Sequence, residues 1–297
     1  MNKRTFSALL LGLLSLSAFA QKLPGTQEAS VWAPANIKVD GKTLEWNDTY
    51  QAFNKNINVF YTVANDRDNL YFVLKSVDPM NSNKIIAGGV NLTINTADKK
   101  SDKDAFVLIF PLINYANLRS TMMQGMRTGG GNPNQAPDSA AIAGMRKKVV
   151  STFKEIKLIG FKDIPDSVIS VYNEYGIKGY VDFDAKGSLI IEMAVPLKVM
   201  NIKTGSPFAY NVKLNGIDVN AMMRAARIDG DMVHASDGAM GGGGDRVVGA
   251  QTVVVGSPRM SMGGGGMSGG MPRSMGDIMG MLSPTDFWGK YTLAEKK

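Results

Sequence analysis

The chain lacks most of the residues from which common active sites are built. Its 297 residues include no cysteine, which excludes disulfides, thiolate metal sites and cysteine nucleophiles. Histidine occurs once, as His234, within a glycine-rich stretch. The one match to G-x-S-x-G, at 266–270, lies in the same glycine-rich stretch, where no strand-to-helix elbow is predicted, and no H-E-x-x-H motif is present. A Ser-His-Asp triad or a zinc protease site therefore has no recognisable basis. These absences predict a protein that is not an enzyme.

Long hydrophobic runs are also missing after the N-terminus. There, Lys3 and Arg4 precede an apolar run from Ala8 to Leu16, and small residues lead up to Ala20. This pattern is typical of a secretory signal peptide cleaved between Ala20 and Gln21. The run is shorter than the roughly 20 apolar residues of a membrane-spanning helix. We therefore expect an exported protein that does not span the membrane after cleavage, located in the periplasm, at the outer membrane or outside the cell.

The charge of the chain is only moderately positive. The sequence has 33 Lys and Arg against 26 Asp and Glu, and loss of Lys3 and Arg4 leaves 31 basic residues. These are scattered rather than interleaved with aromatic residues, so nucleic acid is not an expected partner. Attraction to anionic glycans or membrane surfaces stays open.

Alternating apolar residues point to an all-β fold. The stretch from Val59 to Asp78 contains two such runs joined by the polar residues 65–69, which predicts a β-hairpin. A single hairpin is marginal in water and needs a second sheet to cover it. Further short runs supply one, and they occur at 90–95, 105–110, 153–159, 168–172, 180–183, 189–195 and 208–217. The expected fold is a two-sheet antiparallel β-sandwich.

Two segments interrupt the strands. Residues 115–150 carry apolar residues at helical spacing and predict a short helical insertion. Residues 230–283 are rich in glycine and methionine and predict a flexible excursion. Alternation then returns in a final strand at 286–294. The predicted organisation is a signal peptide (1–20), an extended lead-in (21–35) and one sandwich domain (36–297).

Four stretches resemble family 9 carbohydrate-binding modules and the related DOMON domains. They are VDGKTLEWND (39–48), NVFYTVANDRDNLYFVLKSVDP (58–79), GGVNLTINT (88–96) and LIIEMAVPL (189–197). The similarity is greatest to the exported branch of gram-negative bacteria, rather than to modules attached to xylanases. The resemblance implies a β-sandwich. In sugar-binding members it implies a terminal sugar held between two aromatic rings, and in some members a structural calcium ion.

Candidate carbohydrate-binding residues are Tyr172, Tyr175 and Trp288, each of which could equally be a core aromatic. Trp46 follows a turn directly and is expected in the core. Asp182 and Glu192 could in principle act as a glycosidase pair, although nothing in the sequence gives their separation.

Metal sites are the remaining options. The excursion presents spaced thioethers, which suit Cu(I), at Met260, Met262, Met267, Met271, Met275, Met279 and Met281. The same methionines could instead form an adaptable contact surface. The carboxylates of Asp66, Asp68 and Asp78 offer hard oxygens for Ca²⁺. The alternative is that they belong to a solvent-exposed hairpin turn without a metal.

Three functions are consistent with these features. The leading hypothesis is an exported, non-catalytic protein that binds carbohydrate or another cell-envelope ligand at the rim of the sandwich. The alternative is a structural or assembly protein that docks an envelope partner through its Gly/Met-rich segment. The third is Cu(I) binding by the methionines.

Overall fold

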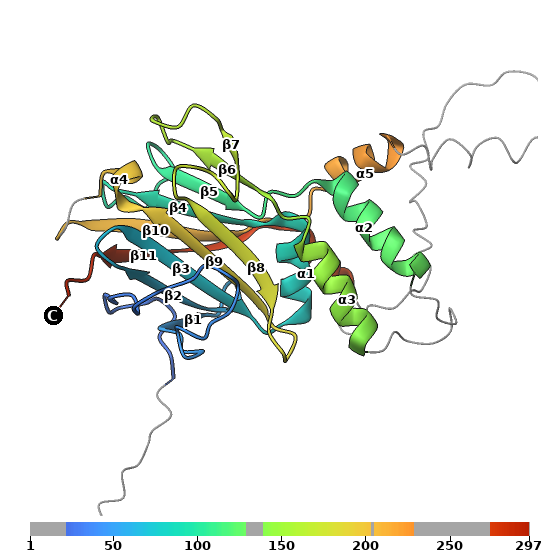
Figure 1. Cartoon of the computed structure of the whole chain (residues 1–297), viewed down its shortest axis with the longest axis horizontal. Helices are drawn as coiled ribbons and strands as arrows, with labels where there is room; N and C mark the ends of the chain where they lie inside the picture. The colour runs from blue at the N-terminus through green and yellow to red at the C-terminus, as the bar shows by residue number, and fades with distance from the viewer. Residues whose placement is uncertain (1–21, 129–138, 203–204, 229–273, 297) are drawn as a thin grey trace, which may run out of the picture.

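The structure is a computed structural model that describes residues 22–128, 139–202, 205–228 and 274–296. Two antiparallel sheets face each other in this part of the chain (Figure 1). Sheet A has the strand order β1-β2-β3-β9-β8, and sheet B has the order β11-β10-β4-β5-β6-β7. The predicted two-sheet antiparallel β-sandwich is therefore confirmed.

The chain passes between the two sheets in blocks of consecutive strands. Sheet A contains β1 (Ala52–Asn54), β2 (Val59–Asn65), β3 (Asn69–Ser76), β8 (Lys178–Phe183) and β9 (Leu189–Pro196). Sheet B contains β4 (Val90–Asn95), β5 (Phe106–Phe110), β6 (Glu155–Ile159), β7 (Val168–Ser170), β10 (Pro207–Leu214) and β11 (Thr285–Thr292).

The hairpin of β2 and β3 forms as predicted, and its turn is fixed by one carboxylate. Asp66 Oδ1 accepts the backbone N–H groups of Asp68 at 2.8 Å and Asn69 at 2.7 Å, and the Tyr71 hydroxyl donates to Asp66 Oδ2 at 2.7 Å. Partial burial raises the pKa of Asp66, but these donors stabilise its charged form and lower the pKa overall. The turn sequence thus sets the register of the hairpin.

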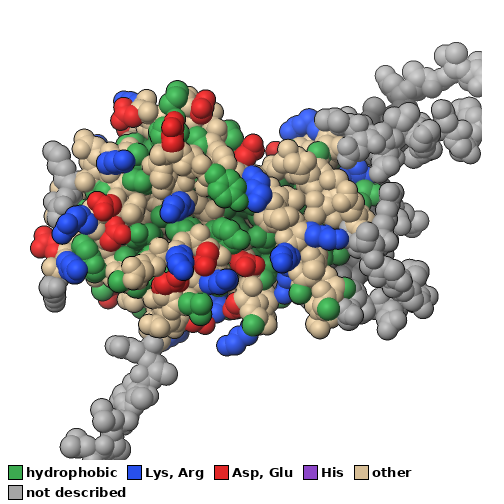
Figure 2. All heavy atoms as spheres, in the orientation of Figure 1, with side chains coloured by type: hydrophobic (Ala, Val, Ile, Leu, Met, Phe, Trp, Pro, Cys, Tyr) green, Lys and Arg blue, Asp and Glu red, His purple; other side chains and the backbone are tan. Residues whose placement is uncertain are grey.

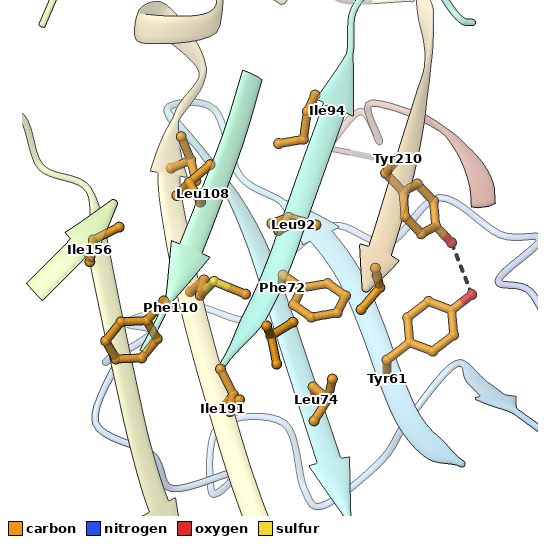
Figure 3. Close-up of a cluster of buried hydrophobic side chains, with 14 of the residues drawn as sticks. Tyr61, Phe72, Leu74, Leu92, Ile94, Leu108, Phe110, Ile156, Ile191 and Tyr210 are labelled. Carbon is orange, nitrogen blue, oxygen red and sulfur yellow. Dashed lines mark hydrogen bonds between the residues drawn. The ribbon is translucent and has the colours of Figure 1, made fainter. Parts of the chain in front are cut away.

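The main core lies between the two sheets. Tyr61 of β2 packs against Phe287 of β11 with ring centroids 5.0 Å apart, and its hydroxyl lies 3.0 Å from that of Tyr210 on β10 (Figure 3). Phe72 and Phe110 are also almost fully buried. Burial of one such side chain contributes about 1.5–3 kcal/mol, so the facing sheets supply the apolar cover that the hairpin alone lacks.

A second, smaller core lies on the outer face of sheet A, under residues 22–50. Trp46 is buried there among Tyr71 and Val73, and its ring meets that of Tyr71 edge-on at 6.2 Å between centroids. The expectation of a core Trp46 is confirmed. Leu44, by contrast, is 77% exposed. It opens a tight turn in which its carbonyl accepts the N–H of Asn47 at 3.1 Å.

Helices gather mainly at one end of the sandwich, where α1, α2, α3 and α5 lie, whereas α4 lies at the other (Figure 1). Their bounds are α1 (Pro79–Gly88), α2 (Tyr115–Thr128), α3 (Ser139–Val150), α4 (Leu197–Met200), α5 (Val219–Ile228) and α6 (Met275–Leu282). Helices α2 and α3 occupy the range of the predicted helical insertion.

Two helices stand where the sequence predicts irregular chain. No helix is predicted between the hairpin and the strand at 90–95, but the Asp78 carboxylate accepts the N–H of Asn81 at 2.7 Å and caps α1, with Pro79 at the first helical position. Helix α6 lies within the predicted flexible excursion. A reciprocal capping box between Ser274 and Asp277 starts that helix, so local capping outweighs the glycine content.

Candidate functional site

The outer face of sheet B presents a tryptophan beside polar side chains. Alternate residues of a strand face opposite sides of a sheet, and Phe287 points into the core. Trp288 therefore faces outward, where it is partly exposed. The strand register places a row of residues across the sheet beside it: Trp288, Asn211, Thr93, Val107 and Ile159.

A second row runs parallel to the first, two residues along each strand. It consists of Asp286, Lys213, Asn91, Ile109, Lys157 and Val168. Neighbouring strands are about 4.8 Å apart, so the Cα positions of Asn211, Lys213 and Asp286 lie within about two strand spacings of that of Trp288. We refer to Trp288, Asn211, Asp286, Lys213 and Asn91 as the Trp288 face.

Hydrogen bonds orient two of these groups. The side-chain amide of Asn211, which is 4% exposed, donates to Asp286 Oδ2 at 2.6 Å and to the Phe287 carbonyl at 2.9 Å. Asn91 Oδ1 accepts the amide of Asn215 at 2.8 Å. The buried amide of Asn211 thus orients the exposed carboxylate of Asp286, and Asn215 orients the partly exposed amide of Asn91. Groups that are already oriented reduce the entropic cost of ligand binding.

Three polar groups of the Trp288 face keep unused hydrogen-bonding capacity. Within the described part of the chain, Asp286 Oδ1, Asn91 Nδ2 and the Lys213 ammonium have no hydrogen-bond or ion-pair partner. They offer an acceptor, a donor and a cationic donor. An aromatic ring flanked by such groups can pack the C–H face of a polar molecule and bind its hydroxyl groups at the same time.

The other predicted aromatic residues do not join Trp288. Tyr172 is 80% exposed and follows β7, at the opposite edge of sheet B from β11. Five strand spacings separate these edges, or about 24 Å, so Tyr172 and Trp288 cannot hold one sugar ring between them. Tyr175 packs against the main core. The Lys154 ammonium lies over the Tyr172 ring, 5.7 Å from its centroid.

Glu192 of the predicted carboxylate pair is sealed from solvent. It is 2% exposed on the outer face of sheet A. Its Oε1 accepts the Trp46 indole N–H at 2.9 Å, and its Oε2 accepts the N–H groups of Asp40 at 3.0 Å and Gly41 at 2.8 Å. Burial raises the pKa of Glu192 to about 7, against the opposing effect of these donors. No substrate reaches this carboxylate, so its role is to hold the N-terminal segment on the sheet.

The predicted calcium ligands lie apart. Asp66 and Asp68 are in the turn before β3, whereas Asp78 follows that strand. A strand of this length spans roughly 25 Å, so the three carboxylates do not form one site. Within the described residues no group of three or more His, Asp or Glu side chains is arranged to hold a metal ion.

Four of the predicted copper ligands lie outside the described residues: Met260, Met262, Met267 and Met271. His234 and the predicted signal cleavage site at Ala20 and Gln21 lie outside them as well. Met275 and Met279 lie four residues apart on one side of α6 and are 74% and 55% exposed. Copper binding and export stay predictions.

One cavity of about 280 Å³ opens at the end of the sandwich opposite most helices. It is lined by Thr96, Asn201, Ile202, Ser206, Pro207 and Phe208. Phe208 is only 1% exposed, so this cavity offers neither a formal charge nor an accessible aromatic ring.

The sequence suggested Trp288 as a candidate but did not indicate which residues lie beside it. The alternation of residues 207–214 and 285–292 gives the two faces of each strand. It does not show that the two strands pair, which is what brings Asn211 and Lys213 beside Trp288.

Comparisons with known proteins add a distant structural similarity. No protein-family model matches the sequence, and no curated protein matches it either. A solved structure with similarity is that of a family 9 carbohydrate-binding module from Caldicellulosiruptor kristjanssonii in complex with glucose. Its TM-score is 0.31 with 10% sequence identity, and the match covers 65% of this chain and 80% of that one. A match at this level transfers neither ligand nor site residues.

Among the described helices, none has the length and apolar character needed to cross a membrane.

Proposed function

We propose that this protein is an exported, non-catalytic binding protein that takes a carbohydrate on the Trp288 face. The observation that carries the proposal is a partly exposed indole ring in register with an oriented amide and flanked by a carboxylate, an ammonium and a second amide. A pyranose ring has an apolar C–H face and a rim of hydroxyl groups. Such a ligand uses both the indole and the unused polar groups around it.

Binding rather than catalysis is supported by the position of the acidic groups. Glu192 is buried under the N-terminal segment, and Asp286 is the exposed carboxylate of the Trp288 face. Hydrolysis of a glycosidic bond by the usual route needs two carboxyl groups on either side of the bond. The Trp288 face offers one, which suits ligand recognition.

The proposal is tested by calorimetric titration of the chain from Gln21 onward with a panel of mono- and oligosaccharides. Trp288→Ala should weaken binding of any sugar found by at least about 30-fold, because a central aromatic residue in an interface commonly accounts for 2 kcal/mol or more. Asp286→Asn keeps the shape but removes the charge, and it should weaken binding less.

Tyr172→Ala is the matched control. It removes an exposed aromatic ring from the opposite edge of the same sheet and should leave the dissociation constant unchanged. Thermal unfolding should show all three variants folded. Absence of heat with every sugar, or full binding by Trp288→Ala, would reject the proposal.

A further inference from the structure

The helices at one end of the sandwich carry the net positive charge of the whole chain. Helices α2, α3 and α5 contain seven Lys and Arg residues and no Asp or Glu: Arg119, Arg127, Arg146, Lys147, Lys148, Arg224 and Arg227. The full sequence has 33 basic and 26 acidic residues, so the remainder is balanced at 26 of each. In Figure 2, Lys and Arg side chains are spread over this end of the molecule.

Not all of these cations are available to a partner. The Arg146 guanidinium stacks on the Phe183 ring at 4.6 Å and fastens α3 to β8. Lys147, Lys148 and Arg224 are exposed, and within the described residues their side chains form no ion pair or hydrogen bond.

The same end presents an unusual share of the exposed apolar side chains. Of the eleven large hydrophobic side chains exposed in the described residues, five belong to α5 and α6. They are Met222 (49%), Met223 (41%), Met275 (74%), Ile278 (40%) and Met279 (55%). Long, unbranched methionine side chains adapt to irregular apolar surroundings.

Backbone contacts hold these helices together. The N–H of Ile217, just before α5, donates to the carbonyl of Met281 in α6 at 3.0 Å. The N–H of Asp218 donates to the hydroxyl of Tyr115, the first residue of α2, at 3.0 Å. Helix α6 contains one acid, Asp277, which accepts the N–H of Ser274 at 3.0 Å as part of the helix cap. Helix α2 also packs against α3 and α5. Cationic and apolar side chains therefore lie on one connected group of helices, α2, α3, α5 and α6, which we term the helical end.

We propose that the helical end docks the protein on a membrane surface rich in anionic lipid. Short helices that combine Lys and Arg with exposed apolar side chains bind the interface of a bilayer, where the apolar groups enter the acyl boundary and the cations meet the phosphates. A nucleic acid would call for stacking aromatic rings, and Tyr115 is the one aromatic residue in these four helices. An acidic protein would satisfy the cations but leaves the five apolar side chains without a specific role. This inference is independent of the proposed sugar site.

The test is co-sedimentation of the chain with vesicles of phosphatidylcholine alone and of phosphatidylcholine with 30% phosphatidylglycerol. We expect binding to the anionic vesicles only, weakened at high salt because screening shortens the reach of the charges. Both the full chain and the chain from Gln21 onward are measured. Binding confined to the full chain would assign it to the N-terminal apolar run and overturn the proposal.

Two variants separate the contributions of charge and apolar contact. K147E/K148E/R224E should weaken binding at least tenfold, and so should M222S/M223S/M275S/M279S. All seven side chains are exposed, so unfolding is not expected, and circular dichroism checks this.

The matched control is K99E/K100E/K103E in the exposed β4–β5 turn, at the other end of β4 from α1. It makes the same change in net charge and should leave vesicle binding within about twofold of the wild type. Equal loss in the control would show that net charge alone is responsible. Binding to no vesicle would overturn the proposal and leave a protein partner as the occupant. A dimer that the serine variant converts to monomer, without any vesicle binding, would also overturn it and assign the helical end to a second copy of the chain.

Discussion

Replacing Glu192 by Gln tests how the N-terminal segment is held on sheet A. The pKa of the buried carboxyl is raised from its ordinary value of 4.5 to about 7, chiefly by burial. The folded state therefore binds this proton more tightly than the unfolded state. The resulting stabilisation is fully present below about pH 4.5 and is lost as the pH rises through 7. At 1.36 kcal/mol per pH unit, the difference amounts to about 3 kcal/mol.

The measurement is urea unfolding of wild type and Glu192→Gln between pH 4.5 and pH 8. Other groups titrate in both proteins, so the informative quantity is the difference between their free energies of unfolding. That difference should change by about 3 kcal/mol over the range, with the wild type losing more stability as the pH rises. Glu155→Gln, an exposed glutamate on β6, is the control and should follow the wild type. A pH-independent difference between wild type and Glu192→Gln would refute the reasoning.

Two further substitutions probe other contacts. Lys75→Met should lower the free energy of unfolding by about 1–3 kcal/mol, because the buried ammonium lies 2.8 Å from Asp48 and 3.1 Å from Asp184. Urea unfolding measures this free energy, and no change would show that the ion pairs contribute no net stability. Gly289→Ala should lower the free energy of unfolding by about 1–3 kcal/mol, because a Cβ there would overlap the Tyr210 ring. Thermal unfolding measures this loss of stability. The double variant with Tyr210→Leu should recover part of it if that overlap is the cause.

The fold could largely be predicted from the sequence where every second residue of a strand is apolar. Every second residue of the hairpin packs in the main core: Val59, Tyr61, Val63, Leu70, Phe72 and Leu74. A one-residue slip would turn these side chains to the wrong face. The run from Phe106 to Phe110 is apolar on both faces, which suits a strand with neighbours on both sides, and it forms β5 in the interior of sheet B.

The helices outside 115–150 were harder to predict. The pair of Asp78 and Pro79 is a helix start signal, but the run that follows is short and ends in two glycines. For α6, the spacing of Ser274 and Asp277 is a capping-box signal. It occurs within the glycine-rich residues 230–283, whose composition favours a flexible chain.

The candidate site could be predicted only in part, because it depends on pairing between distant strands. Trp288 was identified as a candidate, but Asn91 and Asn211 are far from it in sequence and reach it only through the order β11-β10-β4. The same topology separates Tyr172 from Trp288. The contact between Trp46 and Glu192 could not be predicted either, because 146 residues separate the two in the sequence.

The most direct test of the proposed carbohydrate site follows the indole N–H signals of the three tryptophans by NMR during titration with oligosaccharides. Trp46 is buried and hydrogen-bonded to Glu192, and Trp32 lies at the bridge to Asn65 beside sheet A, so their signals should stay in place. The Trp288 signal should shift in proportion to the bound fraction. A sugar that binds without moving the Trp288 signal, or a panel in which no sugar moves it, would contradict the proposed site.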